Sequence, residues 1–385
     1  MPRIAEIPVP NRPDNGTARP LLGGRVLANV WVTIALWTAS NVFTSGIAKL
    51  ATWEGAANYR HMADFCRWDC NWYASVVQSG YWSTPIKESI AVNWPFYPLF
   101  PLSAYVLRES FRLSIPTSLV LAGKLELLFA IYAFMLMFSE ELESIEDRVR
   151  AASLVAFNPY LIYAHAGYAE PLYFALIALS FYFAKRSKWL AAGSMAGLAS
   201  ATRILGVVFC ASYLISAFRK DTSRVLLRNL DLNKIIGLLL CPLGTAFFLL
   251  YLYHHTGDAL AFEHAHVSWG KVPGNPLHTL VWCFVQTHWP RVWGVMILVA
   301  WLASAWLFKL RKPEMGTFLA LVVLIAASTG YWAVARYIWW QPPFLYAIYR
   351  LLRRSSGAWL VYTAFAAGMA AFMVVEWFSG HNFVV

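Results

Sequence analysis

The chain alternates long apolar blocks with short polar and basic clusters, beginning near Leu27 and continuing almost to the last residue. A helix needs about 20 apolar residues to cross a bilayer core, so these blocks predict transmembrane helices, whereas a β-barrel would alternate polar and apolar positions. Several blocks are short, and those at 169–184, 189–202 and 205–218 are candidates for buried or half-length helices. The predicted spans cover residues 27–47, 117–138, 151–165, 169–184, 189–202, 205–218, 234–254, 291–308, 315–333, 337–349 and 357–376.

The composition excludes most other classes of protein. Apolar residues make up 59% of the 385 residues, and Asp, Glu, Lys and Arg together make up 13%, where a soluble domain carries about 25%. A soluble fold of this size cannot hide so much apolar surface, and the same excess excludes intrinsic disorder. No internal repeat or low-complexity tract divides the chain. The sequence therefore predicts an all-α polytopic membrane protein in which residues 1–385 form a single domain.

The basic residues set the expected orientation in the membrane. Most of the 31 Lys and Arg residues fall on the inner side if the N-terminus is cytoplasmic, which is the positive-inside pattern. Eleven spans then leave the C-terminus outside. Residues 1–26 are polar and rich in Pro and Arg, so we expect a cytoplasmic tail and no cleavable signal peptide. The net charge of +11 is explained by this topology and by contact with anionic membrane lipids, and no nucleic-acid partner is expected.

With eleven spans and a cytoplasmic N-terminus, residues 48–116 form one large external loop. Residues 96–113 within it are apolar enough to look like a span, but a crossing there would move the basic cluster at 185–188 to the outer side. We therefore expect 96–113 to form a re-entrant or interfacial amphipathic helix. The alternative is a true span at 96–113, with the block at 151–165 not crossing.

This external loop carries the densest group of polar and aromatic residues: Arg67, Trp68, Asp69, Trp72 and Tyr73. At a membrane–water boundary, aromatic rings stack on the faces of sugars and arginines neutralise phosphate. A carboxylate there takes the proton from an attacking hydroxyl. The alternative is a solvated amphipathic loop whose charges have no catalytic role.

More polar residues are expected on the same outer side, at the ends of other spans. Any one of them has an alternative interpretation as a side chain that snorkels to the interface, but Arg203 interrupts a long apolar stretch. An acid, arginines, a lysine and histidines on one face would suit a phosphate-bearing lipid substrate. These additional candidates are Tyr168, Glu170, Arg203, His266, Lys271 and Arg336.

Nothing in the sequence indicates a metal or a nucleotide cofactor. The five cysteines form no metal-ligand or disulfide framework. Cys66 and Cys70 are close enough in sequence to pair, but we expect them to be free thiols. His264 and His266 are two residues apart, which is a poor spacing for helical metal ligands. No phosphate-binding glycine motif or nucleophile elbow occurs, which disfavours a cytoplasmic enzyme that uses ATP or a nucleotide sugar.

Several segments occur in the order seen in one known family. RWDCNWY at 67–73, followed by Gly80 and Tyr81, is similar to an RWDxxWY…GY loop, and WPFYPLFPL at 94–102 is similar to an FFPLYPL element. On these segments the chain resembles the PIG-V family, the second mannosyltransferases of GPI-anchor assembly and their prokaryotic relatives. Further similarities to this family lie at NPY (158–160), AGYAEPLY (166–173), ATRILG (201–206), AF…H…WG (261–270) and RY (336–337).

The resemblance implies a GT-C glycosyltransferase: a bundle of about 11 transmembrane helices with a catalytic first external loop. Such an enzyme moves a sugar, mannose in this family, from a polyprenyl-phosphate-linked donor to a lipid-linked or other extracytoplasmic acceptor. The reaction inverts the anomeric carbon and needs no cofactor or metal. We assign Asp69 as the general base. The phosphate-side candidates are Arg203, Arg336 and Lys271, and the candidates for holding sugar or acceptor are Arg67, Trp68, Trp72, Tyr73, Tyr168, Glu170 and His266.

Two other classes of function stay open on the sequence. A flippase or transporter for lipid-linked saccharides would carry polar residues through the middle of the membrane and inverted repeats, whereas these spans are nearly uncharged at mid-depth. A non-catalytic assembly subunit should tolerate the loss of Asp69.

Overall fold

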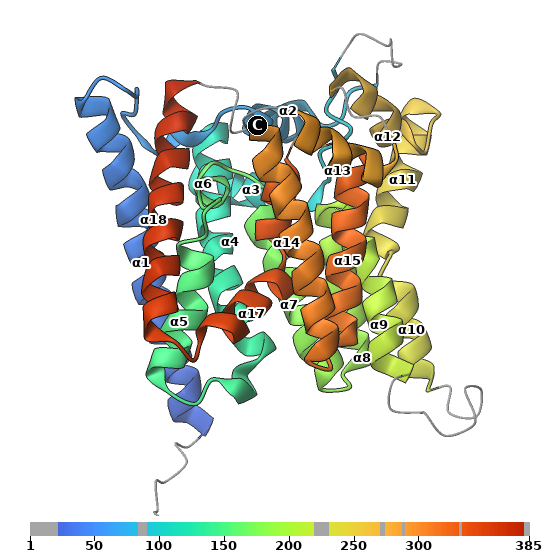
Figure 1. Cartoon of the computed structure of the whole chain (residues 1–385). Helices are drawn as coiled ribbons and strands as arrows, with labels where there is room; N and C mark the ends of the chain where they lie inside the picture. Colours follow the sequence, from blue (N-terminus) through green and yellow to red (C-terminus); the bar gives the residue numbers. More distant parts are fainter. Residues whose placement is uncertain are drawn as a thin grey trace, which may run out of the picture.

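A computed structural model describes residues 22–83, 91–218, 231–269, 274–286, 289–330 and 333–380. Within these ranges the protein is a helical bundle without strands, and most helices run side by side along one axis (Figure 1). The α-helices are α1 (Leu22–Trp53), α2 (Asp69–Ser79), α3 (Leu99–Phe111), α4 (Ile115–Met137), α5 (Ile145–Ala156), α6 (Ile162–His165), α7 (Glu170–Lys185), α8 (Trp189–Thr202), α9 (Phe209–Phe218), α10 (Leu232–Leu240), α11 (Leu243–Thr256), α12 (Ala261–Ala265), α13 (Pro276–Val285), α14 (Trp289–Lys309), α15 (Pro313–Ser328), α16 (Val334–Trp339), α17 (Pro342–Leu352) and α18 (Ser356–Ser379). Four short 3₁₀ helices join them: η1 (Met62–Phe65), η2 (Ser139–Glu141), η3 (Ile204–Val208) and η4 (His266–Trp269).

Each predicted span contains helix, but the helices differ in length, and the spans at 151–165 and 337–349 are each divided between two helices, α5 with α6 and α16 with α17. The span at 315–333 extends beyond the end of α15 at Ser328 into residues outside the described ranges. In the described part of the chain, four helices are long and apolar enough to cross a membrane: α1, α4, α14 and α18. Helices α10 and α11 make a fifth candidate if they are one span bent by 45°. Pro242 lies at this break, and proline removes a helical hydrogen bond. The remaining blocks hold shorter helices, as expected for 169–184, 189–202 and 205–218, so the total of eleven crossings stays a prediction.

Helix α1 is longer than the predicted span at 27–47. It begins at Leu22 and ends at Trp53, because no proline interrupts the segment and Ala48 and Ala51 remain buried against neighbouring helices. The chain leaves the helix at Gly55, whose φ of +76° lies in the left-handed region that glycine tolerates. The helix therefore extends past both ends of the predicted span, into the residues assigned to the tail (1–26) and to the external loop (48–116).

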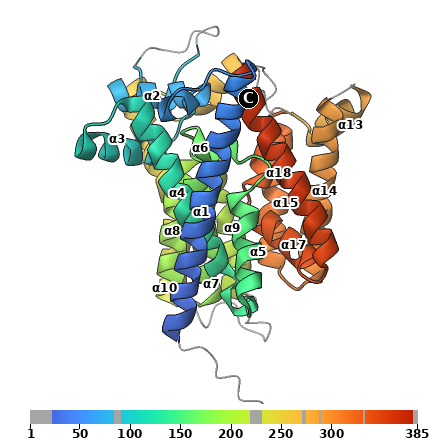
Figure 2. The ribbon, with the colours of Figure 1, turned by 90° about the vertical axis from the view of Figure 1, so that its left-hand side faces the viewer.

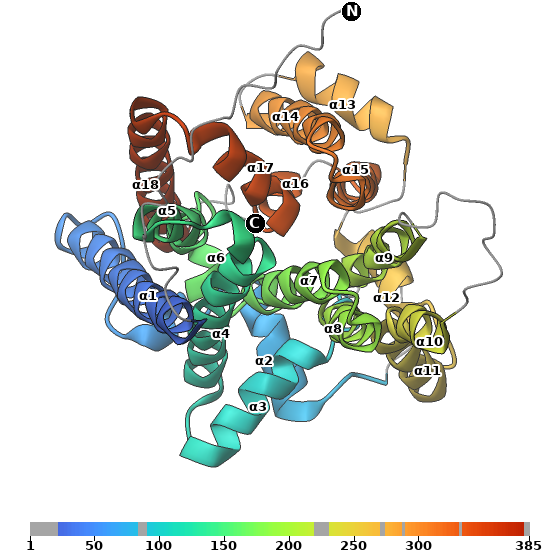
Figure 3. The same cartoon turned by 90° about the horizontal axis from the view of Figure 1, so that it is seen from below.

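The centre of the bundle is formed by α4, α7 and α8. Helix α7 packs between α4 and α8, and the view along the bundle axis places α1, α5 and α18 on one side and α14, α15 and α17 on another (Figure 3). Fully buried side chains such as Phe134 and Phe174 fill this centre. The central position of α7 fixes both of its ends, which carry charged residues.

Helices α2 and α3 lie across one end of the bundle instead of along its axis (Figure 2). Helix α3 is 13 residues long, which is short of a bilayer core. It is tied to α4 by a hydrogen bond of 2.7 Å from the Ser103 hydroxyl to Glu126 Oε1. This is the position expected of the interfacial amphipathic helix at 96–113.

Helix α8 lies against α10 and α11 with almost no space between the backbones. A Cβ atom on Gly193 would lie 2.0 Å from the carbonyl oxygen of Gly237, and one on Gly244 would lie 2.2 Å from that of Gly197. Small residues four apart allow this close approach of membrane helices. The contact fixes the C-terminal end of α8, where the chain turns at Arg203.

Candidate active site

A cavity of about 340 Å³ lies at the end of the bundle that carries α2 and α12. It collects side chains from segments far apart in the sequence: α2, the start of α7, the turn after α8, α12 and α16. Its lining residues are Asp69, Tyr73, Pro95, Phe96, Tyr97, Tyr168, Glu170, Thr202, Arg203, Ile204, Leu205, Phe262, Glu263, His266, Ile325, Ala326, Ser328, Thr329, Arg336 and Tyr337.

Asp69 is the first residue of α2 and faces this cavity. Its backbone N–H donates a hydrogen bond of 3.0 Å to the Tyr168 hydroxyl, and Trp68 before it adopts a φ of +54°, a conformation that non-glycine residues adopt only when their surroundings impose it. Asp69 Oδ2 lies 3.1 Å from Arg336 Nη1, and the side chain is 20% exposed. Among the described residues Oδ1 has no hydrogen-bond partner, so this oxygen can accept a proton from a bound hydroxyl.

Glu170 is the second carboxylate of the cavity, and it is almost fully enclosed. It begins α7, where the helix dipole favours a negative charge, and its side chain is 1% exposed. Its Oε1 lies 2.5 Å from Arg203 Nη1 and 3.3 Å from Arg336 Nε. Two guanidinium groups therefore share one buried carboxylate, and Arg336 bridges Glu170 to Asp69.

The two arginines are held by aromatic faces as well as by charge. The Arg203 guanidinium lies 4.7 Å from the centre of the Tyr337 ring, and the Arg336 guanidinium lies 4.9 Å from that of Tyr163. Cation–π contacts strengthen when both groups are removed from water, and the Arg203 and Arg336 side chains are 17% and 6% exposed. The arrangement presents fixed cations to the cavity, which is the arrangement that stabilises a developing phosphate charge.

Aromatic rings form one wall of the cavity. Tyr73 packs edge-on against Phe96 at 5.0 Å and against Phe100 at 4.9 Å. Burial raises the pKa of Tyr73 above its ordinary value, so the phenol keeps its proton at neutral pH and acts as a hydrogen-bond donor instead of a base. Rings with polar tips are suited to bind the apolar face and the hydroxyls of a sugar.

His266 also lines the cavity, and its Nδ1 lies 3.2 Å from Glu263 Oε2. Glu263 is a cavity residue that the sequence analysis missed, and Tyr97 and Tyr337 are others. Glu263 lies inside the 261–270 segment used for the family resemblance, which was the only signal available for it.

Three predicted site residues lie outside the cavity. Arg67 donates hydrogen bonds to the carbonyl oxygens of Trp377 and Phe378, at 3.2 and 3.1 Å, and so ties the loop to α18. Trp72 stacks on Phe96 from behind the aromatic wall, with ring centres 6.1 Å apart. Trp68 Nε1 is buried without a hydrogen-bond partner among the described residues. A fourth candidate, Lys271, falls outside the part of the chain that the structure describes.

The expectation that Cys66 and Cys70 are free thiols is wrong, because the structure joins them in a disulfide. Cys66 follows η1 and Cys70 lies in the first turn of α2, and the tight turn between these helices brings their Cα atoms to 5.2 Å, within the range that a disulfide requires. The bridge encloses Asp69. Cys210, Cys241 and Cys283 are free.

Within the described ranges, no group of three or more His, Cys, Asp or Glu side chains is arranged to hold a metal ion. The charged groups of the cavity are the carboxylates of Asp69, Glu170 and Glu263 and the guanidinium groups of Arg203 and Arg336. Three ion pairs join Asp69, Glu170, Arg203 and Arg336.

No model of a known protein family matches the chain, and no curated protein matches it by sequence. The fold is similar to the crystal structure of ArnT from Cupriavidus metallidurans bound to undecaprenyl phosphate, with a TM-score of 0.51 and 16% sequence identity over 90% of this chain and 64% of ArnT. The apo state of that ArnT gives a TM-score of 0.48 and 16% identity, over 90% of this chain and 63% of ArnT. This chain thus spans less than two thirds of the ArnT length.

At this level of identity the likeness defines the fold. The chain is an integral, multi-pass membrane protein of all-α architecture, and its helical bundle has the fold seen in ArnT.

Proposed function

We propose that this protein is a membrane glycosyltransferase that moves a sugar from a polyprenyl-phosphate-linked donor to an extracytoplasmic acceptor, with inversion at the anomeric carbon. The observation that carries the proposal is the meeting of Asp69, Arg336, Glu170 and Arg203 in one cavity at the end of a GT-C-type bundle. An ArnT structure contains undecaprenyl phosphate, which supports a lipid phosphate as donor. Mannose as the sugar rests on the PIG-V resemblance alone.

In this mechanism Asp69 is the general base. An acceptor hydroxyl attacks the anomeric carbon, its proton passes to Asp69, and the bond from the sugar to the phosphate oxygen breaks. Such a proton transfer contributes about 10²–10⁴-fold to the rate. The leaving group is a lipid phosphate, whose added charge is stabilised by the arginines.

From the ion pairs we infer which contact the donor phosphate would replace on binding. Arg336 is bound to Asp69 on one side and Glu170 on the other. A donor phosphate offers Arg336 a new anionic partner, so we expect it to replace Asp69 Oδ2 at this guanidinium and leave the carboxylate for the acceptor hydroxyl. Glu170 would keep both arginines in place throughout, as a positioning residue.

Asp64 is the other acid of the loop, and its surroundings suit a structural role. Its Oδ2 accepts hydrogen bonds from the backbone N–H groups of Arg60 and His61, at 2.6 and 2.9 Å, and its Oδ1 lies 3.0 Å from His61 Nδ1. These contacts stabilise the start of η1, and Asp64 does not line the cavity.

The proposed function is tested with purified protein in lipid vesicles that contain radiolabelled polyprenyl-phosphate-mannose and a mixed lipid acceptor fraction. Formation of a labelled glycolipid, absent in Asp69→Asn, supports a transferase. Movement of the label across the bilayer without formation of a new product would indicate a flippase. Full complementation of a deletion strain by Asp69→Asn would indicate a non-catalytic assembly subunit.

The orientation is part of the proposal and has two independent supports. Disulfides persist in oxidising compartments, so the Cys66–Cys70 bridge favours an extracytoplasmic position for the Asp69 end of the bundle. The opposite end carries basic clusters such as 185–188 and 350–354, which favour the cytoplasm. The N-terminus is then cytoplasmic.

We expect a cysteine placed at Ser114 to react with a membrane-impermeant thiol reagent in intact cells. Ser114 is exposed at the start of α4, beside α3, and the proposed topology puts it outside. The matched control is Ser355, which is exposed at the start of α18 at the opposite end. Both variants are made in a background without Cys210, Cys241 and Cys283. Labelling of Ser114→Cys only after permeabilisation, with Ser355→Cys labelled in intact cells, would reverse the orientation.

Arg203 is expected to determine donor affinity. Arg203→Lys keeps the charge but loses the planar fork that binds phosphate oxygens in pairs, so the donor KM should rise, and it should rise further in Arg203→Ala. Initial rates at varied donor concentration measure this. An unchanged donor KM in a folded Arg203→Ala protein would remove Arg203 from the phosphate site.

A further inference from the structure

A second cavity of about 340 Å³ lies at the other end of the bundle. It is bounded by the C-terminal ends of α4, α7 and α9 and by the turns that join α7 to α8 and α14 to α15. Helix α7 begins with Glu170 in the first cavity and ends with Lys185 in the second. At 1.5 Å per residue the two ends are about 22 Å apart, so the second cavity is a separate site.

Cations predominate in its lining. Lys185, Arg311 and Lys312 face a single carboxylate, that of Glu314. Lys185 and Lys312 also pair with the two glutamates of η2, at 2.8 and 3.7 Å. Arg311 has no ion pair with a described residue, so its charge is the one available to an anion that enters the cavity.

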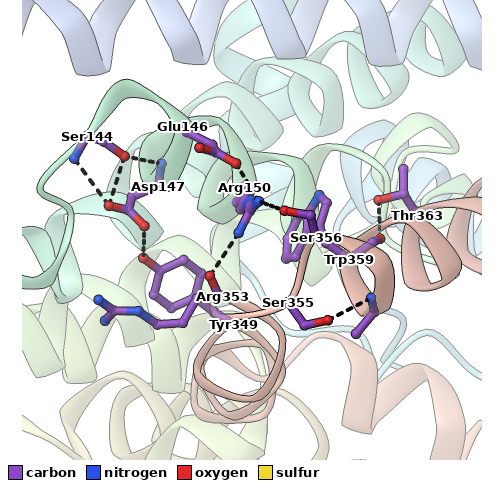
Figure 4. A network of polar contacts seen from close by, with 11 residues as sticks. Ser144, Glu146, Asp147, Arg150, Tyr349, Arg353, Ser355, Ser356, Trp359 and Thr363 are labelled. Atoms are coloured by element: carbon purple, nitrogen blue, oxygen red, sulfur yellow. Dashed lines mark hydrogen bonds and ion pairs between the residues drawn. The ribbon is translucent and has the colours of Figure 1, made fainter.

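The neighbouring surface at the same end gives a contrast. There Asp147 Oδ1 accepts a hydrogen bond of 3.1 Å from the Tyr349 hydroxyl, and Arg150 donates one of 2.8 Å to the Arg353 carbonyl oxygen (Figure 4). Arg150 also pairs with Glu146. This network closes the junction of α5, α17 and α18 with its own charges, whereas at the second cavity Arg311 forms no ion pair within the described part of the chain.

The rest of the lining is apolar or carries hydroxyls. Met137, Phe138, Phe181 and Met315 provide the apolar surface, and Ser187 lies beside the cations. A free phosphate ion would gain nothing from methionine and phenylalanine side chains, but a lipid headgroup brings its glycerol and the first part of its acyl chains with it. Basic pockets between membrane helices on the cytoplasmic side are suited to bind anionic headgroups.

We propose that this second cavity binds the phosphate of an anionic membrane lipid, with Arg311 as its principal cation. The proposed orientation places the cavity at the cytoplasmic leaflet, but the binding chemistry does not depend on that orientation. The site is also separate from the Asp69 cavity, so a failed glycosyltransferase assay leaves this proposal untouched, and a failed lipid assay leaves the proposed function untouched.

The test compares wild-type protein with Arg311→Gln in nanodiscs of phosphatidylcholine, with and without phosphatidylglycerol. Lipid retention is measured by native mass spectrometry and thermal unfolding by intrinsic fluorescence. We expect phosphatidylglycerol to raise the unfolding temperature of the wild type, and Arg311→Gln to bind it about fivefold more weakly, as for the loss of one basic contact at a membrane surface. Lys309→Gln is the matched control, because Lys309 is exposed two residues earlier in the chain and does not line the cavity.

Loss in Arg311→Gln with retention in Lys309→Gln supports the site. Equal phosphatidylglycerol binding by wild type and Arg311→Gln would overturn it. A third arm adds inorganic phosphate to the phosphatidylcholine discs. Stabilisation by inorganic phosphate that requires Arg311, without a response to phosphatidylglycerol, would assign a soluble phosphate ligand and overturn the lipid assignment.

Discussion

Replacing Asp69 by Asn is expected to lower the turnover number by at least about 10²-fold while the donor KM stays nearly unchanged. Asn keeps the size of the side chain and an oxygen that accepts a hydrogen bond from Arg336, now 3.1 Å from Oδ2. It cannot take a proton from the acceptor hydroxyl. Initial rates in vesicles with a radiolabelled polyprenyl-phosphate sugar measure both parameters.

Asp64→Asn is the matched control, since it makes the same chemical change in the same loop. Asp64 caps η1 through the backbone of Arg60 and His61 and does not line the cavity, so turnover should stay close to that of the wild type. Near-normal turnover in folded Asp69→Asn, together with inactivity of Asp64→Asn or Glu170→Gln, would mean that the base is a different residue. If all three variants are active, a mechanism with a single carboxylate is wrong.

The sequence could predict which residues gather at one end of the bundle, because that depends only on the order and direction of the spans. Asp69 lies in the first external loop, and Glu170, Arg203 and Arg336 each flank an apolar block. The parity of the blocks puts all four on one side. The sequence could not predict which of these side chains contact one another. Asp69 and Arg336 are 267 residues apart, and their contact depends on how short helices tilt and rotate in the packed bundle.

The sequence also could not predict the direction in which a single side chain points. Arg67 and Asp69 are two residues apart at the start of α2, and both looked equally suited to a polar site. The structure turns Arg67 toward the end of α18, where it binds two carbonyl oxygens, and Asp69 toward the cavity. The backbone at Trp68, with its φ of +54°, separates the two directions, and no pattern of residue types signals such a conformation.

The prediction that Cys66 and Cys70 are free thiols was wrong for a related reason. A separation of four residues places two side chains on one face of a helix without requiring a bond. In this chain the helix is interrupted between Cys66 and Cys70, and the turn brings them together. The apolar pattern was more informative for the bundle, because helical periodicity and length reflect burial, and each predicted block contains helix in the structure.

Glu170→Gln is expected to destabilise the protein by about 3–5 kcal/mol, because it breaks a buried ion pair and leaves charge without compensation. Glu170 is 1% exposed, and its Oε1 is shared by Arg203 and Arg336. Without the carboxylate, two guanidinium groups in one buried site would be balanced only by Asp69. Equilibrium unfolding in detergent micelles measures the change in the free energy of unfolding.

A second substitution separates this electrostatic effect from simple loss of packing. In Glu170→Gln/Arg203→Gln one cation is removed together with the anion, so part of the lost stability should return, as a double-mutant cycle would show. Glu263→Gln is the matched control, because Glu263 lines the same cavity but is 36% exposed and pairs only loosely with His266, at 3.2 Å. It should change stability by less than about 1 kcal/mol. Wild-type stability of Glu170→Gln, or a double variant less stable than the single one, would contradict the role of Glu170 as the anion that holds both arginines.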